Sequence, residues 1–180
     1  LTVPHSIETW NVDGLEPRLK NNLPDMHLYA CQVNKRQPSM IFIQEVRLRC
    51  HTDQGHGVVH PQDERYLTQL LELLPAYEVQ ALSLATKKYS GQLMLLRRGV
   101  QTPHLSYTFS TTSQSHDREG RIIVAEFKDL VVLATYTPCT GRLSRESLLR
   151  RRSFEKNVLK FVTNHQTVTI KPLIYCGDLN

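Results

Sequence analysis

Pro172-Leu-Ile-Tyr-Cys-Gly-Asp-Leu-Asn180 is the stretch around which the rest of the chain is organised. It is a short apolar run bounded by Pro and Gly, a pattern that predicts a buried strand. Side chains two positions apart lie on one face of a strand, so Asp178 and Asn180 are expected to emerge together at its carboxyl end. Ligands usually bind at that end of parallel strands, and the stretch therefore predicts a functional site.

An earlier segment repeats this arrangement near the start of the chain. Ser6 to Val12 predicts a short strand that delivers Asn11 and Asp13 to a turn at Asp13-Gly14. Asn and Asp are also common in turns because their side chains hydrogen-bond to nearby backbone. An ordinary turn is therefore the alternative to a functional pair here.

A third strand end carries Glu45. Ser39 to Val46 predicts a buried strand because Met40 to Ile43 is continuously apolar, and Glu45 closes the run. A buried carboxylate requires a cation or a metal to offset the loss of hydration, so Glu45 is a candidate metal ligand. The alternative is a solvated Glu that lies just outside the strand.

The remaining pattern predicts strands that follow one another with few helices between them. Helices are expected at Pro24 to Arg36, Asp63 to Leu74 and Ser144 to Asn164. Further strands are expected at Tyr77 to Leu84, Gln92 to Leu96, His104 to Ser110, Arg121 to Phe127 and Leu130 to Tyr136. The apolar stripe of the last helix is predicted to consist of Leu148, Phe154, Val158 and Phe161. This order indicates packed sheets flanked by helices.

Composition bounds the class of protein and its partners. The 180 residues contain no linker or repeat, so residues 1–180 are interpreted as one domain. The net charge of +5 favours an anionic partner, and Lys and Arg gather at Lys87-Lys88, Arg97-Arg98 and Arg142 to Lys160. A solvated helix face is the alternative explanation of the last cluster.

The cysteines and the chain ends indicate where such a protein acts. Cys31, Cys50, Cys139 and Cys176 form no CxxC pair, which favours reduced thiols in an intracellular protein. Neither a membrane-spanning apolar run nor a leader is visible. The chain starts at Leu1 without Met, so a partial sequence is expected.

Motifs at these strand ends occur in a fixed order along nearly the whole chain. They are Thr9-Trp-Asn-Val-Asp-Gly-Leu15, Ile43-Gln-Glu45, Tyr89-Ser-Gly91, His116-Asp-Arg-Glu-Gly-Arg-Ile-Ile-Val-Ala-Glu-Phe127, Tyr136-Thr-Pro138 with Gly141-Arg142, and Cys176-Gly-Asp-Leu-Asn180. In this order and spacing they resemble the exonuclease III-type apurinic/apyrimidinic (AP) endonucleases of the endonuclease/exonuclease/phosphatase superfamily. The block that ends at Phe127 favours the AP endonuclease branch.

The resemblance implies a fold and a metal site. The implied fold is α/β, a four-layered αββα sandwich of two packed mixed sheets flanked by helices, with its C-terminal strands missing from residues 1–180. Glu45 resembles the main metal ligand, Asp13 an additional carboxylate and Asn11 a polar group that orders the site. Oxygen ligands with open water positions favour Mg²⁺, with Mn²⁺ as a substitute.

The resemblance also implies roles in phosphodiester hydrolysis. Asp178 resembles the residue that activates or positions the attacking water, and Asn180 and Tyr136 resemble groups that hold the scissile phosphate. The implied nucleic-acid contacts are Arg121, Arg142, Tyr89 and Arg47, the last in place of the family's Lys.

Departures from the family pattern qualify these roles. Cys139 stands where the family usually has Asn, which exchanges an amide donor for a weak thiol donor. The family's later catalytic Asp and its Ser-Asp-His motif would lie beyond Asn180, so residues 1–180 alone are expected to be inactive. Ser115-His116-Asp117 precedes Arg121 in the matching block and is interpreted as a loop.

The implied function is an enzyme of base excision repair. It would incise double-stranded DNA 5′ to abasic sites, with 3′-5′ exonuclease or 3′-phosphodiesterase activity, as an intracellular monomer, nuclear in a eukaryote. One alternative is a catalytically impaired nucleic-acid-binding relic of the family. Another is a superfamily relative that cuts a different nucleic acid such as RNA.

Overall fold

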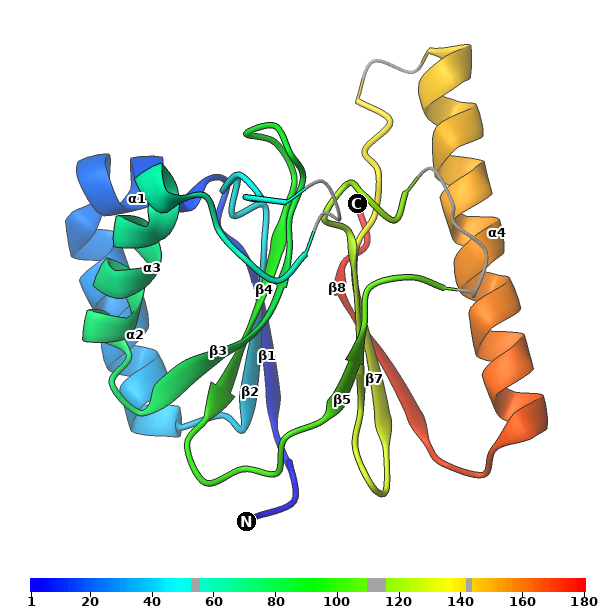
Figure 1. Ribbon diagram of the computed structural model, residues 1–180, viewed down its shortest axis with the longest axis horizontal. Helices are drawn as coiled ribbons and strands as arrows, with labels where there is room; N and C mark the ends of the chain where they lie inside the picture. Colours follow the sequence, from blue (N-terminus) through cyan, green and yellow to red (C-terminus); the bar gives the residue numbers. More distant parts are fainter. Residues whose placement is uncertain (53–55, 110–115, 142–143) are drawn as a thin grey trace.

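Two packed sheets with helices on both outer faces make up the computed structural model, which describes residues 1–52, 56–109, 116–141 and 144–180. The layers run helices, sheet, sheet, helix (Figure 1). This arrangement confirms the predicted α/β four-layered sandwich.

The first sheet has the strand order β1-β2-β4-β3. Its strands are β1 (Ile7–Asn11), β2 (Met40–Gln44), β3 (Tyr77–Ser83) and β4 (Gln92–Arg97). β1 runs parallel to β2, and β4 runs antiparallel to both β2 and β3. Every residue of β2 is buried, as its continuous apolar run predicts.

The second sheet has the order β5-β6-β7-β8. Its strands are β5 (His104–Ser106), β6 (Ile122–Glu126), β7 (Val131–Tyr136) and β8 (Leu173–Asp178). β8 pairs in parallel with β7, and the other pairs are antiparallel. The expected strand from His104 to Ser110 ends at Ser106, and Ser110 lies outside the described residues.

The prediction that β8 is buried is wrong. Ile174 is 42% exposed and Tyr175 is 39% exposed. Within the described residues β8 is an edge strand that pairs with β7 alone, so its outer side lacks a neighbour. An apolar run indicates a strand, but it does not tell an edge from a centre.

Of the helices in the described part of the chain, the first three cover the first sheet and the last covers the second (Figure 1). They are α1 (Leu15–Asn21), α2 (Leu23–Arg36), α3 (Pro61–Leu73) and α4 (Arg145–Val168). α1 was not among the expected helices. Its Pro17 lies in the first helical turn, where Pro is tolerated because its missing N–H has no partner to lose. None of the helices in the described part of the chain is long and apolar enough to cross a membrane.

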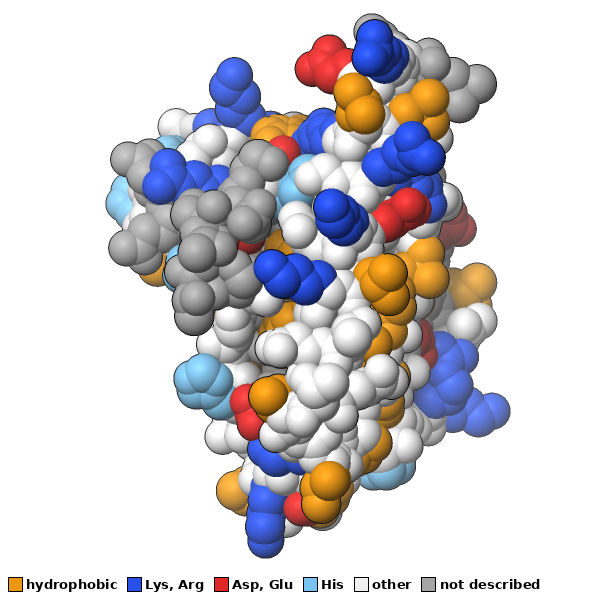
Figure 2. All heavy atoms as spheres, turned by 90° about the vertical axis from the view of Figure 1, so that its right-hand side faces the viewer, with side chains coloured by type: hydrophobic (Ala, Val, Ile, Leu, Met, Phe, Trp, Pro, Cys, Tyr) orange, Lys and Arg blue, Asp and Glu red, His pale blue; other side chains and the backbone are white. Residues whose placement is uncertain are grey.

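α4 is held to the second sheet mainly by Phe154 and Val158, which are buried. Leu148 was expected in the same stripe, but it is 43% exposed because that part of the helix extends past the sheet. Figure 2 shows the face that carries α4, where Lys and Arg side chains alternate with exposed apolar ones. This face has both charged and apolar surface.

The space between the sheets is filled by a second apolar cluster, separate from the one beneath α1–α3. At its upper end two buried amides replace apolar side chains. Gln44 donates from Nε2 to Oε1 of Gln92 at 3.4 Å, and Gln92 donates from Nε2 to the Ala134 carbonyl at 3.2 Å. A polar link therefore joins β2 and β4 to β7 directly below the strand ends.

Candidate active site

The carboxyl ends of β1, β2, β7 and β8 meet at one end of the sandwich. Asn11 Nδ2 donates to Asp178 Oδ2 at 2.5 Å. The Tyr136 hydroxyl donates to Glu45 Oε1. Each bond joins the first sheet to the second, so four residues that are far apart in the sequence form one cluster.

The loop that carries Glu45 is shaped by its backbone. Glu45, Arg47 and Asp13 all have positive φ, at 54°, 51° and 53°. Gly14 N donates to Glu45 O at 2.8 Å, which ties this loop to the turn after β1. Non-Gly residues adopt such angles only where surrounding structure imposes them, and such residues cluster at functional sites.

The Tyr89-Ser90-Gly91 motif supports the same loop from the other side. Arg47 N donates to Ser90 O at 2.9 Å, and Val46 N donates to Gly91 O at 3.2 Å. Gly91 has φ 91°, and a Cβ there would lie 2.9 Å from Val46 Cγ2, so only glycine fits without strain. Tyr89 itself is 40% exposed at the edge of the site.

The guanidinium of Arg47 lies between the carboxylates of Asp13 and Glu45, so positive charge is favourable at this place. Its Nη2 lies 2.5 Å from Asp13 Oδ1 and 2.9 Å from Glu45 Oε2. Among the described residues no group of three or more His, Cys, Asp or Glu could enclose a metal ion. Mg²⁺ is commonly held by one or two carboxylates and several waters, so Glu45 and Asp13 fit such an ion.

Strand alternation predicts that the side chains of Asp178 and Asn180 lie side by side, but in the structure they do not. β8 ends at Asp178, and Asn180 adopts φ 51°. The Asn180 backbone N donates to Asp178 Oδ1 at 3.0 Å, while its Nδ2 donates to the Thr137 carbonyl at 2.7 Å. The turn therefore sends the Asn180 amide toward the end of β7.

Arg121 lies inside the protein, behind Tyr136. It is 6% exposed, its Nη1 donates to the Tyr136 carbonyl at 3.0 Å, and its guanidinium lies 4.8 Å from the centre of the Tyr136 ring. Burial raises the pKa of the Tyr136 hydroxyl, and its hydrogen bond to Glu45 raises it further. Tyr136 is therefore a hydrogen-bond donor at neutral pH.

Cys139 and His116 were also singled out in the sequence, and they differ in burial. Cys139 is exposed in the segment after β7. Arg142 lies outside the described residues. His116, interpreted as part of a loop, is 2% exposed.

Sequence reasoning missed two residues that shape the site. Arg151 of α4 donates to the carbonyls of Asn180 at 2.5 Å and Leu179 at 2.9 Å, although a solvated helix face was the alternative explanation of its cluster. Gln92 is fully buried, and a polar residue at the start of an apolar run was the only local signal for it. The sequence did not indicate the hydrogen-bond partners of either residue.

The sequence of this chain is similar to those of known nucleases. Residues 9–180 match the Endonuclease/Exonuclease/phosphatase family. A DNA-(apurinic or apyrimidinic site) endonuclease of Arabidopsis thaliana is 30% identical over 98% of this chain and 50% of its own length. A protein of the same description from Plasmodium falciparum (isolate 3D7) is 40% identical over 97% of this chain and 32% of its own length.

Solved structures show the same fold. An AP endonuclease from Archaeoglobus fulgidus aligns with a TM-score of 0.64 at 18% identity, over 97% of this chain and 56% of the other. The chain spans half or less of the length of the two curated relatives.

Proposed function

Because the chain belongs to the Endonuclease/Exonuclease/phosphatase family, we propose that its protein is an AP endonuclease that incises DNA 5′ to abasic sites with a divalent metal, Mg²⁺ or Mn²⁺. The observation that supports this most is the pair of hydrogen bonds that joins Asn11 to Asp178 and Tyr136 to Glu45 across the sheets. A carboxylate pair, an amide and a phenol around one position suit phosphodiester hydrolysis.

Glu45 and Asp13 would hold the metal ion. When bound, the ion supplies positive charge that offsets the charge of the phosphoryl oxygens. Arg47 already contacts both carboxylates, and its side chain is 42% exposed. It can therefore turn toward a phosphate at the surface, in the role of a DNA contact.

Asp178 would position the attacking water and accept its proton. Asn11 binds one of its oxygens and the Asn180 backbone N–H binds the other, so the carboxylate has a fixed orientation. Such fixed orientation is what places a water in line with the scissile bond.

Tyr136 and Asn180 would hold the phosphate. Both side chains now donate within the protein, to Glu45 and to the Thr137 carbonyl. Each must exchange that acceptor for a phosphoryl oxygen when DNA binds. The net charge of +5 favours the approach of DNA.

The test is incision of an abasic duplex by the full-length protein, with Mg²⁺ and with a chelator. Undamaged duplex and abasic RNA serve as controls. We expect incision of the abasic duplex that stops with chelator. Binding without incision would show the nucleic-acid-binding relic instead, and preferred cleavage of RNA would show a relative with another substrate.

A further inference from the structure

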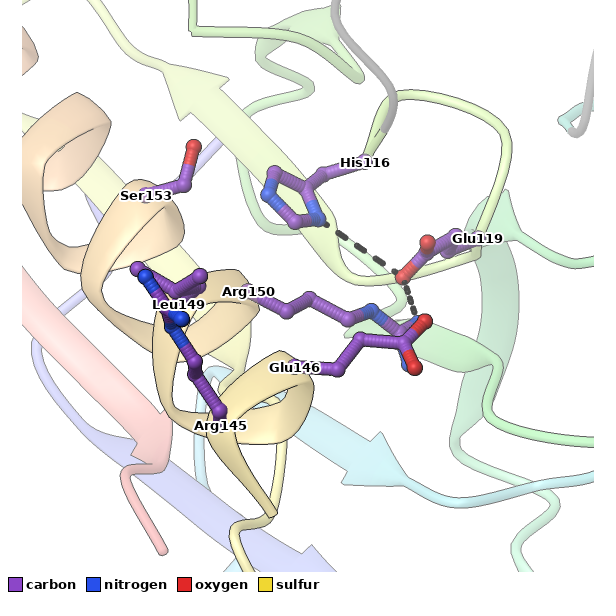
Figure 3. A pocket seen from close by; sticks show the side chains of 7 residues that line it. All are labelled: His116, Glu119, Arg145, Glu146, Leu149, Arg150 and Ser153. Atoms are coloured by element: carbon purple, nitrogen blue, oxygen red, sulfur yellow. Dashed lines mark hydrogen bonds and ion pairs between the residues drawn. The ribbon is translucent and has the colours of Figure 1, made fainter.

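One oxygen of Glu119 lies close to nitrogen atoms of two arginines and one histidine. Its Oε2 lies 2.7 Å from Arg121 Nε, 2.5 Å from Arg150 Nη2 and 3.7 Å from His116 Nδ1, as Figure 3 shows in part. Burial raises the pKa of Glu119, but its contacts with His116, Arg150 and Arg121 outweigh burial and lower that pKa to about 2. The carboxylate is therefore ionised at neutral pH.

Arg121 connects this carboxylate to the active site. Its guanidinium is almost fully buried, and Glu119 is the carboxylate that compensates its charge. The same guanidinium donates to the Tyr136 carbonyl and lies against the Tyr136 ring, and the Tyr136 hydroxyl donates to Glu45. The contacts form a continuous series from Glu119 to Glu45.

The backbone between Glu119 and Arg121 is fixed by close packing on the first sheet. Gly120 has φ 66°, and a Cβ there would lie 2.6 Å from Ser83 O and 2.9 Å from Gly91 Cα. Glu119 forms an isolated bridge with Ala85. The backbone therefore has little freedom, and the side-chain contacts decide where the Arg121 guanidinium lies.

We propose that Glu119 is a positioning residue, which holds Arg121 against Tyr136 and so places the Tyr136 hydroxyl for the reaction. A buried guanidinium that loses its carboxylate is strongly destabilised and moves toward water. Without Glu119, Arg121 would leave the Tyr136 ring, and the ring would lose a packing contact that holds it in place. This role rests on the proposed function for its kinetic consequence, but not for the structural link.

α4 contributes a second, weaker hold through Arg150. This side chain reaches Glu119 across a surface pocket of about 660 Å³ (Figure 3). The pocket is lined by His116, Glu119, Arg145, Glu146, Leu149, Arg150 and Ser153. Arg150 is 42% exposed, so solvent screens its pair with Glu119 more than it screens the buried Arg121 pair.

A double-mutant cycle tests the kinetic link. Glu119→Gln keeps the shape of the side chain and removes its charge. In the full-length protein we expect it to lower kcat for abasic-site incision roughly 10-fold and to change KM less than about 2-fold, because the substrate contacts remain. In a Tyr136→Phe background the same change should lower kcat less than about 2-fold. Equal losses in both backgrounds would overturn the proposal.

Two further variants grade the effect. Arg150→Ala should lower kcat about 3-fold. Arg145→Ala is the matched control, because Arg145 lines the same pocket and forms no ion pair among the described residues. It should leave kcat unchanged. A loss with Arg145→Ala as large as with Arg150→Ala would show a general effect of surface charge and would contradict the positioning role of Glu119.

A measurement without substrate separates this inference from the proposed function. With ¹³Cζ-labelled tyrosine, the Tyr136 resonance is assigned by its loss in Tyr136→Phe. Glu119→Gln should shift that resonance and leave the resonance of buried Tyr77 in place. If Glu119→Gln fails to fold, Arg150→Ala should give a smaller shift of the same resonance. An unmoved Tyr136 resonance would overturn the proposal even in an active enzyme, whereas a shift in an inactive protein would refute only the function.

Discussion

The candidate site has two acidic corners, one at Glu45 and one at Asp178. Both residues close an apolar run in the sequence, but their surroundings in the structure differ. Glu45 follows β2, which is buried throughout and paired on both sides, and hydrogen bonds from the turns after β1 and before β4 fix its loop. Asp178 ends β8, which is an edge strand among the described residues and has exposed side chains. Its supports are Asn11 from the other sheet and Arg151, which binds the two residues that follow. An apolar run closed by a carboxylate thus predicts a site, but distant segments decide how firmly it is held.

The largest expected effect lies at the firmly held corner. Glu45→Gln removes a charge and keeps the shape, so the proposed metal loses its main ligand. In the full-length protein kcat/KM for abasic-site incision should fall roughly 10²- to 10³-fold at saturating Mg²⁺, on the order of 3–4 kcal/mol. Glu8→Gln is the control, since Glu8 lies on β1 in an ion pair with Arg36. An unchanged rate and metal requirement would remove Glu45 from the site.

Packing at the edge-strand corner is tested by Gly177→Ala. Gly177 has φ 117°, and a Cβ there would overlap the Thr135 carbonyl oxygen of β7. The free energy of unfolding should fall by about 3 kcal/mol. Gly99→Ala should lower it by only about 1 kcal/mol, because Gly99 also has positive φ, 85°, but open space around it. Urea unfolding compares the two, and equal losses would show that β8 does not depend on this close approach.

The polar link between the sheets gives an intermediate effect. Gln92→Leu leaves the buried Gln44 amide without its acceptor and should lower the free energy of unfolding by about 2 kcal/mol. Gln44→Leu together with Gln92→Leu should be less destabilising than the sum of the single changes, because no unpaired amide remains. Urea unfolding of the three variants measures this coupling. Strict additivity would mean that the amides act separately.

The smallest effect is expected from Cys139→Asn. An amide offers directed donors where the thiol offers a weak one. Cys139 is exposed, so a restored hydrogen bond competes with water, and the gain in transition-state stabilisation should be about 1 kcal/mol, or roughly 5-fold in kcat. Cys31→Asn, an exposed position on α2, should leave kcat unchanged. A rate unaltered by Cys139→Asn would mean that phosphate binding does not use this position.

Local sequence patterns predicted where helices and strands form better than they predicted which residues are buried. The helical period of its apolar residues predicted α2, and Met26, Ala30 and Val33, which follow that period, are buried, because helix periodicity is a property of the segment itself. The same logic failed for β8, whose exposure depends on which strands pair with it. It also gave no hint that Arg121 is buried, since Glu119 offsets its charge only in the folded chain.

The sequence identified the candidate site residues, but it did not predict which of them form hydrogen bonds with one another. Strand ends and the family resemblance indicated Asn11, Glu45, Tyr136 and Asp178. The bonds of Asn11 to Asp178 and of Tyr136 to Glu45 arise from the packing of two sheets. Asn180 lies beyond the end of β8 and itself has a left-handed backbone, at φ 51°, which strand alternation could not predict.

The central claim is that the two corners work as one unit, and a double-mutant cycle between Glu45 and Asp178 tests it most directly. The measurement is kcat/KM for abasic-site incision at saturating Mg²⁺ by the full-length protein, Glu45→Gln, Asp178→Asn and the double variant. Groups that act together are grossly non-additive, so the double variant should be no slower than the slower single variant by more than about 3-fold. Losses that multiply in full would contradict the claim and show two independent sites.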